Sequence, residues 1–117
     1  MSAYDTVVLL SLLLFGHLLA DYPLQGLWMS QVKNRHNPVP GVPWHQGMLA
    51  HCGIHAGFVG LISGSLILAL LELVAHAVID DLKCAKRIGY TTDQMLHISC
   101  KVAWTGVVVI AWGGISW

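Results

Sequence analysis

Long apolar stretches are the feature of this sequence that most limits its fold. Four of them, at residues 4–20, 48–62, 66–82 and 94–112, are separated by segments that carry all the prolines and most of the basic residues. Of the 117 residues, 56% are hydrophobic and 10% are charged, whereas about a quarter of the residues in soluble domains are charged. A soluble core of this size could not bury so much apolar surface. The sequence therefore predicts an all-α, polytopic membrane protein, a compact four-helix transmembrane bundle in a single membrane domain over residues 1–117.

The segments between the apolar stretches predict how the helices are connected. Residues 24–44 contain basic residues and three prolines, so this segment cannot cross a bilayer. Its apolar residues at 24–29 predict one short interfacial helix between the first and second spans. The turn at Ser63-Gly64-Ser65 is short and predicts an antiparallel hairpin of the second and third spans. Thr91-Thr92-Asp93 resembles a helix cap and predicts the start of the fourth.

The distribution of basic residues predicts the orientation in the membrane. In a four-span topology the loops after the first and third helices lie on one side, and they hold five of the six basic residues: Lys33, Arg35, Lys83, Lys86 and Arg87. The positive-inside rule places both loops in the cytoplasm and both termini outside, in a multi-pass inner-membrane protein. The formal net charge of zero gives no electrostatic footprint for nucleic acid, so the lipid bilayer is the expected partner.

Nine ionisable side chains lie near the predicted cytoplasmic ends of the four helices. Within each helix they are four residues apart, which places them on one helical face. They are His17 and Asp21; His51 and His55; Glu72, His76 and Asp80; and Asp93 and His97. Four inward-facing stripes at one depth predict a common centre, as in metal sites of helical bundles. A further ionisable residue, Lys101, is expected to reach the interface or to pair with a carboxylate.

The energetic cost of buried carboxylates favours a metal at this centre. An unpaired charge at membrane depth costs about 2.5–3.5 kcal/mol, even on lenient scales. A divalent cation neutralises carboxylates while neutral imidazoles complete its coordination. Nine candidates exceed the four ligands of one zinc ion, so we expect zinc, as one ion or as two ions that share a bridging carboxylate. A hydrogen-bonded polar core or a proton relay is the alternative, because a single membrane histidine is more often packed or hydrogen-bonded than a ligand.

Four motifs carry a resemblance to a known family. They are His17-x-x-x-Asp21-x-x-x-Gln25, a central His51, His76-x-x-x-Asp80-x-x-Lys83 and Asp93-Gln94-x-x-His97. In order and spacing the chain resembles the DUF3307 family, small and largely uncharacterised membrane proteins of bacteria and their phages. The resemblance implies that Gln25 supports the ligands and that Lys83 and Gln94 contact a substrate. His55 and Glu72 fall outside these motifs, and their inclusion rests on helical spacing alone.

Three functions fit these features. The first is a metal-dependent hydrolase that acts on a lipid-linked or phosphate-containing substrate at the cytoplasmic interface, with Glu72 or Asp93 as the general base. The second is a non-catalytic protein that interacts with other membrane proteins and contains a structural metal or a polar core. The third is a cation or proton transporter, which the scarcity of polar residues in the outer halves of the helices disfavours. The oligomeric state stays open.

Overall fold

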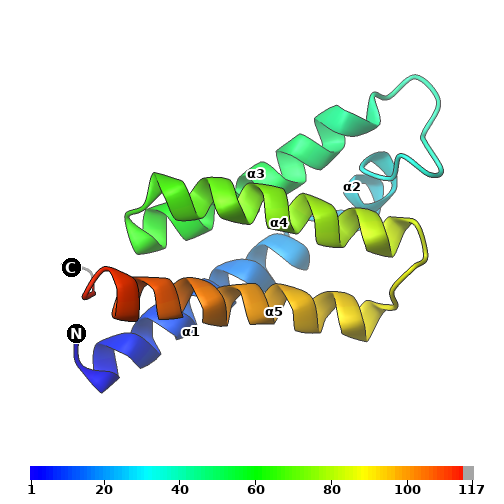
Figure 1. Ribbon diagram of the computed structural model, residues 1–117. Helices are drawn as coiled ribbons and strands as arrows, with labels where there is room; N and C mark the ends of the chain where they lie inside the picture. The colour runs from blue at the N-terminus through cyan, green and yellow to red at the C-terminus, as the bar shows by residue number, and fades with distance from the viewer. Residues whose placement is uncertain (115–117) are drawn as a thin grey trace.

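The computed structural model describes residues 1–114, and within them the fold is entirely helical. The elements are α1 (Ala3–Asp21), α2 (Gly26–Val32), α3 (Trp44–Ser63), α4 (Leu66–Cys84), α5 (Tyr90–Gly106) and a π-helical continuation of α5, η1 (Val107–Ala111), as Figure 1 shows. The all-α prediction is therefore confirmed. The last three residues of the predicted domain, 115–117, lie outside the described residues.

The four long helices form a closed arrangement along one axis. The molecule measures 49 × 23 × 23 Å. Helix α1 packs against α3 and α5, and α4 packs against the same two helices, so each long helix has two neighbours. The start of α1 and the end of η1 lie at one end, and α2 with its loop lies at the other end (Figure 1). Side chains from all four long helices can therefore meet in the centre of the bundle.

The turn between α3 and α4 has the predicted hairpin form. Gly64 ends α3 in the left-handed conformation, with φ of 69°, and its N–H donates to Gly60 O at 2.8 Å. This conformation suits glycine because it has no Cβ. The next residue, Ser65, caps α4, because its Oγ accepts the N–H of Leu68 at 3.1 Å. The antiparallel hairpin predicted from this turn is confirmed.

Two helix starts differ from the sequence-based prediction. Helix α3 begins at Trp44, directly after Pro43, rather than at residue 48. Helix α5 begins at Tyr90 with Gly89 as its N-cap, so the predicted cap at Thr91-Thr92-Asp93 is wrong. Asp93 lies inside the first turn of α5 and is buried. Because α5 begins earlier than predicted, Asp93 lies within the helix instead of at its cap. The short helix predicted near residues 24–29 corresponds to α2.

Burial in this bundle is the reverse of that in a soluble protein. Among the described residues, twelve buried residues are polar or charged and eleven are hydrophobic. Large apolar side chains are exposed along every long helix, including Phe15 on α1, Leu61 on α3 and Val74 on α4. A purely apolar cluster is confined to a few residues of α1, α3, α4 and η1: Leu9, Leu13, Val59, Leu68 and Val108. The exterior is therefore apolar and much of the interior is polar.

Two of the helical segments are long and apolar enough to cross a membrane. They are α1 and the continuous segment formed by α5 and η1, Tyr90–Ala111. Helix α3 contains three histidines and α4 contains four charged residues, and neither is among these two segments. Length and composition thus support membrane association through two helices. Crossing by α3 and α4, and with it the four-helix transmembrane bundle, stays a prediction.

Candidate metal centre

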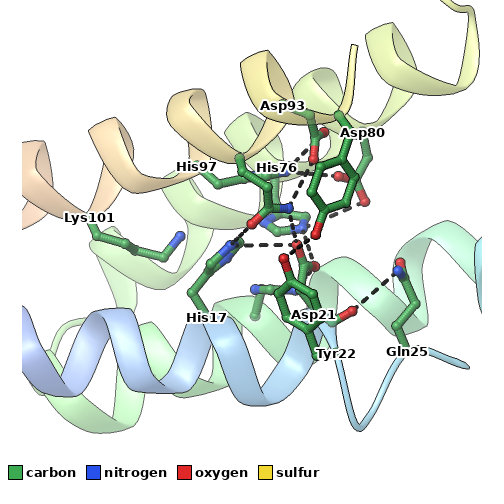
Figure 2. A network of polar contacts seen from close by, with 12 residues as sticks. His17, Asp21, Tyr22, Gln25, His76, Asp80, Asp93, His97 and Lys101 are labelled. Carbon is green, nitrogen blue, oxygen red and sulfur yellow. Dashed lines mark hydrogen bonds and ion pairs between the residues drawn. The ribbon is translucent and has the colours of Figure 1, made fainter. Parts of the chain in front are cut away.

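Five imidazole rings from the four long helices meet in the centre of the bundle. His55 and His76 stack with ring centroids 3.7 Å apart, and His76 and His97 stack at 4.0 Å. His51 lies 4.8 Å from His55, and His17 lies 5.2 Å from both His55 and His97. Figure 2 shows His17, His76 and His97 pointing toward one another from three different helices. All five side chains are buried.

Asp21 lies within reach of three of these rings. Its Oδ1 is 2.8 Å from His55 Nε2, 3.3 Å from His51 Nε2 and 3.8 Å from His76 Nε2. One ligand atom from each of Asp21, His51, His55 and His76 can be chosen so that all four lie within 4.8 Å of one another. The atoms around a tetrahedral zinc with bonds of about 2.0–2.1 Å lie roughly 3.3 Å apart. These four residues therefore match a metal-binding set in both number and spacing.

Asp80 and Asp93 extend the cluster toward His97. His97 Nε2 lies 3.0 Å from Asp80 Oδ1 and 3.4 Å from Asp93 Oδ1. The other oxygen of Asp80, Oδ2, lies 3.2 Å from His51 Nε2 and 3.6 Å from His76 Nε2. Asp80 thus has one oxygen beside His51 and His76 and the other beside His97. Two further sets of potential ligands are the rings of His17, His76 and His97, and Asp21 with Asp93 and His97.

Several polar atoms in this centre have no hydrogen-bond partner among residues 1–114. They include His51 Nε2, His76 Nε2 and Asp93 Oδ1, which face the other ligand atoms. Buried polar groups are nearly always paired, so each exception requires an explanation. Imidazole nitrogens and carboxylate oxygens are the usual ligands of zinc and similar cations. The orphaned atoms and the type of ligand therefore both fit a bound divalent ion.

Glu72 does not join the other eight predicted ligands. One of its oxygens, Oε1, accepts from Lys101 Nζ at 2.6 Å and from His76 Nδ1 at 3.1 Å. The second oxygen accepts from Trp104 Nε1 at 2.6 Å. Glu72 therefore lies behind His76, on the side of the ring away from the shared centre. Carboxylates in this position fix the orientation of a histidine ligand.

Gln94 and Gln25 support the carboxylates of the cluster. The amide of Gln94 donates to Asp21 Oδ2 at 2.9 Å and to Asp93 Oδ2 at 3.1 Å. Its Oε1 accepts from His17 Nε2 at 3.0 Å. All polar atoms of Gln94 are thus engaged with proposed ligands, although the family resemblance implied a substrate contact. Gln25 acts through a lysine, because its Oε1 accepts from Lys33 Nζ at 2.5 Å.

Lys33 is a site residue that the sequence analysis missed. Its Nζ donates to Asp80 Oδ2 at 2.7 Å, and the side chain is largely buried. By sequence it is one of several basic residues in a polar loop, and no local pattern predicts that the end of α2 turns it toward Asp80. Lys83, which the resemblance did indicate, lies at 3.8 Å from Asp93 Oδ2 and is about one-third exposed.

Comparison with known proteins agrees with the motifs. Residues 9–114 match a family described as protein of unknown function (DUF3307). The chain belongs to this family. The match covers nearly the whole chain, so the resemblance drawn from the four motifs is confirmed. No curated protein matches the chain, and no solved structure matches it.

The polar end of this DUF3307 protein is held together by contacts outside the cluster. Tyr22, directly after α1, forms a hydrogen bond through its hydroxyl with the hydroxyl of Tyr90, at the start of α5. Arg35 donates to both oxygens of Asp81, at 2.7 and 2.9 Å. This pairing raises the pKa of Arg35 above its ordinary value. The contacts attach the α2 loop to α4 and join the ends of α1 and α5.

Proposed function

We propose that this chain is an integral inner-membrane protein whose histidine and aspartate cluster binds one or two divalent metal ions, zinc first among them. We further propose that the metal serves the hydrolysis of a lipid-linked or phosphate-containing substrate at the cytoplasmic interface. The observation that carries the proposal is the meeting of five histidines and three aspartates from four helices at one buried centre. Such a set is costly to bury unless a cation or a complete hydrogen-bond network compensates it.

Ring stacking supports a cation rather than a network of charged histidines. Two of the ring pairs, His55 with His76 and His76 with His97, have centroids 3.7 and 4.0 Å apart. Positive charges on neighbouring rings at this spacing would repel one another strongly in a buried site. Neutral imidazole is the form that coordinates metals. Lys33 lies beside Asp80 and Lys83 beside Asp93, whereas Asp21 has no lysine partner among the described residues. With neutral histidines, a divalent ion would supply the positive charge that Asp21 needs.

The carboxylate positions support two ions as well as one. Asp21 directs Oδ1 toward His51, His55 and His76, while its Oδ2 lies on the side of Gln94. Asp80 likewise has Oδ2 beside His51 and His76 and Oδ1 beside His97. A carboxylate with its two oxygens in two ligand sets is suited to bridge two metal ions.

Hydrolysis needs a general base beside the metal, and Asp93 fits that role better than Glu72. Asp93 Oδ1 is buried and has no hydrogen-bond partner within residues 1–114. Glu72, in contrast, already accepts three hydrogen bonds and is paired with Lys101. When bound, a divalent metal makes water nucleophilic near neutral pH and polarises an ester or phosphoryl group. Asp93 would then hold the water proton, and Gln94 would keep Asp93 and Asp21 in place.

The apolar exterior supports a location within the membrane. Exposed side chains such as Phe15, Leu61 and Ile110 would be unfavourable in water and suit lipid. In the proposed topology α1, α3, α4 and α5 all cross the membrane, and the end that carries α2 faces the cytoplasm. This places the basic loops inside and the metal centre near the inner interface.

The test is elemental analysis of detergent-purified protein together with variants of two ligands. Wild-type protein should contain stoichiometric metal. His76→Ala and Asp80→Ala should lose it and should also lose hydrolytic activity. The matched control is His45→Ala, because His45 is an exposed histidine outside the cluster. Far-UV circular dichroism should show that each variant keeps its helices. A well-folded wild-type protein without metal would refute the proposal.

Deep burial favours a structural metal site as a second candidate. Apart from Asp21, whose side chain is 8% exposed, the proposed ligands have side chains that are at most 3% exposed. A closed, fully coordinated site has no open position for a substrate. Chelator-resistant metal in a protein without hydrolytic activity would favour this candidate. The apolar cluster around Leu9, Leu13 and Val59 closes the bundle toward the termini, which disfavours transport across it.

A further inference from the structure

A small pocket adjoins the metal centre at the α2 end of the molecule. Its volume is about 220 Å³, below the roughly 300–1,000 Å³ of pockets for drug-sized ligands. Three lysines line it, together with a hydroxyl and two amides: Lys33, Lys83, Lys86, Ser30, Gln25 and Asn34. Three lysines in the lining of so small a pocket suit an anion with several oxygens.

Two of these lysines connect the pocket directly to the carboxylates of the cluster. Lys33 Nζ is 2.7 Å from Asp80 Oδ2, and Lys83 Nζ is 3.8 Å from Asp93 Oδ2. In the absence of metal ions, the negative charges of these carboxylates compensate the positive charges of the lysines. A divalent ion beside Asp80 and Asp93 would compensate the negative charge of these carboxylates in place of the lysines and leave the positive charge of the lysines free. Metal binding should therefore turn the pocket into an anion site.

The third lysine stands in an unusual backbone conformation. Lys86 has a φ of 60°, and it is the one non-glycine residue with positive φ among residues 1–114. It follows the end of α4, where its N–H donates to Lys83 O at 2.9 Å and Arg87 N–H donates to Leu82 O at 3.0 Å. Glycine is the usual residue in this position, because a side chain in the left-handed region is strained. Strained positions gather at functional sites.

We infer that this pocket binds a phosphate group, as part of a phosphomonoester, when metal occupies the neighbouring cluster. The inference rests on the proposed function and names the substrate group of the same site. Lysine is a common phosphate ligand, and Lys86 makes no ion pair among the described residues that would compete for it. The phosphate lies beside Asp80 and Asp93, next to the proposed metal ions. A lipid headgroup and a soluble ester share this chemistry.

The experiment measures binding of inorganic phosphate to the full chain in detergent, by isothermal titration calorimetry. Wild-type protein is loaded with zinc, freed from excess zinc, and compared with metal-stripped protein. Metal-stripped protein should bind phosphate at least tenfold more weakly. Lys86→Gly should weaken binding by about tenfold, roughly the effect of one charge-assisted contact, without lowering the melting temperature, because glycine relieves the strained φ. Arg87→Gly, the matched control, removes a neighbouring charge that does not line the pocket and should change binding by less than about twofold.

A second arm identifies the source of the phosphate group. Zinc-loaded protein is placed in nanodiscs of phosphatidylcholine with or without phosphatidic acid, and the phosphate titration is repeated. Competition by phosphatidic acid that disappears in Lys86→Gly supports a lipid phosphomonoester. Undiminished phosphate binding in both discs supports a soluble one.

The outcomes separate this inference from the proposed function. Protein that binds no metal overturns both. If zinc-loaded protein does not bind phosphate, the inferred phosphate site is refuted, while the proposed metal site is unaffected. Equal losses in Lys86→Gly and Arg87→Gly overturn the inference as well, because they reveal a general charge effect rather than a pocket.

Discussion

Replacing Lys101 by methionine should strongly destabilise the bundle. The side chain of Lys101 is 1% exposed, and its Nζ is 2.6 Å from Glu72 Oε1, which is equally buried. Methionine fills a similar volume and removes the charge. Glu72 would then be a buried carboxylate without a counter-charge. Loss of one partner of a buried ion pair typically costs about 3–5 kcal/mol, and we expect a destabilisation of that size.

A second substitution should recover most of this loss. Glu72→Gln in the Lys101→Met background removes the uncompensated charge and keeps a carbonyl oxygen for the N–H of Trp104, while its NH2 group can donate to Nδ1 of the other His76 tautomer. Each of these hydrogen bonds contributes about 1 kcal/mol, and leaving a donor unpaired costs about 1–3 kcal/mol. The double variant should therefore lie within about 1–2 kcal/mol of wild type. Glu72→Gln alone leaves Lys101 unpaired and should be strongly destabilising.

The assay is a double-mutant cycle on unfolding in detergent. Far-UV circular dichroism follows the helices, and fluorescence follows the five tryptophans together, among them Trp104, whose Nε1 donates to Glu72 at 2.6 Å. The cycle should give a coupling energy of a few kcal/mol between positions 72 and 101. A cost below about 1 kcal/mol for Lys101→Met, or no recovery in the double variant, would contradict the assigned pairing.

Three further predictions follow from the helix contacts and the topology. Gly47→Ala should destabilise the protein by about 1–3 kcal/mol in thermal unfolding and should weaken phosphate binding. The reason is that the new Cβ would lie 2.8 Å from Val32 Cγ2 and displace Lys33. Gly53→Ala, with no atom within 4 Å of its Cβ, is the control and should be neutral or stabilising. Ser65→Ala should lower stability by about 1 kcal/mol, because it removes the cap that accepts the Leu68 N–H at 3.1 Å, and no loss in chemical unfolding would argue against that cap. Cys84, which is partly exposed at the end of α4, should react with a membrane-impermeant maleimide in inside-out vesicles only. Buried Cys52 should not react in either orientation. Labelling of Cys84 in right-side-out vesicles would reverse the proposed topology.

The convergence of the ligands could be predicted from sequence because it depends on two simple periodicities. Spacings of four residues place His17 with Asp21 and His51 with His55 on one helical face. The alternation of helix direction then puts the stripes of all four helices at one depth. Neither argument requires knowledge of side-chain packing, and eight of the nine predicted residues meet in the structure.

The role of Glu72 could not be predicted in the same way. Its spacing from His76 is the same four residues, so the sequence assigns it to the same stripe. The stripe of ionisable residues on α4 extends beyond the shared centre, however. A residue one turn past the centre contacts the side chains that the neighbouring helix places at the same level. Here α5 offers Lys101 and Trp104, and the carboxylate becomes a support for His76. Helical spacing thus predicts the face of a residue, and the neighbouring helix decides its partner.

Lys33 shows a second limit of prediction from the sequence, and this limit concerns charge rather than geometry. The positive-inside rule counts Lys33, Lys83 and Lys86 as loop charges that set orientation. The fold of α2 brings the first of them back to Asp80, and the end of α4 brings the others to the same pocket. The same basic residues can therefore orient the protein in the membrane and hold an anion beside the metal centre. A variant such as Lys86→Gly separates the two roles, because the remaining loop charges still favour the same orientation while the pocket loses one of its three lysines.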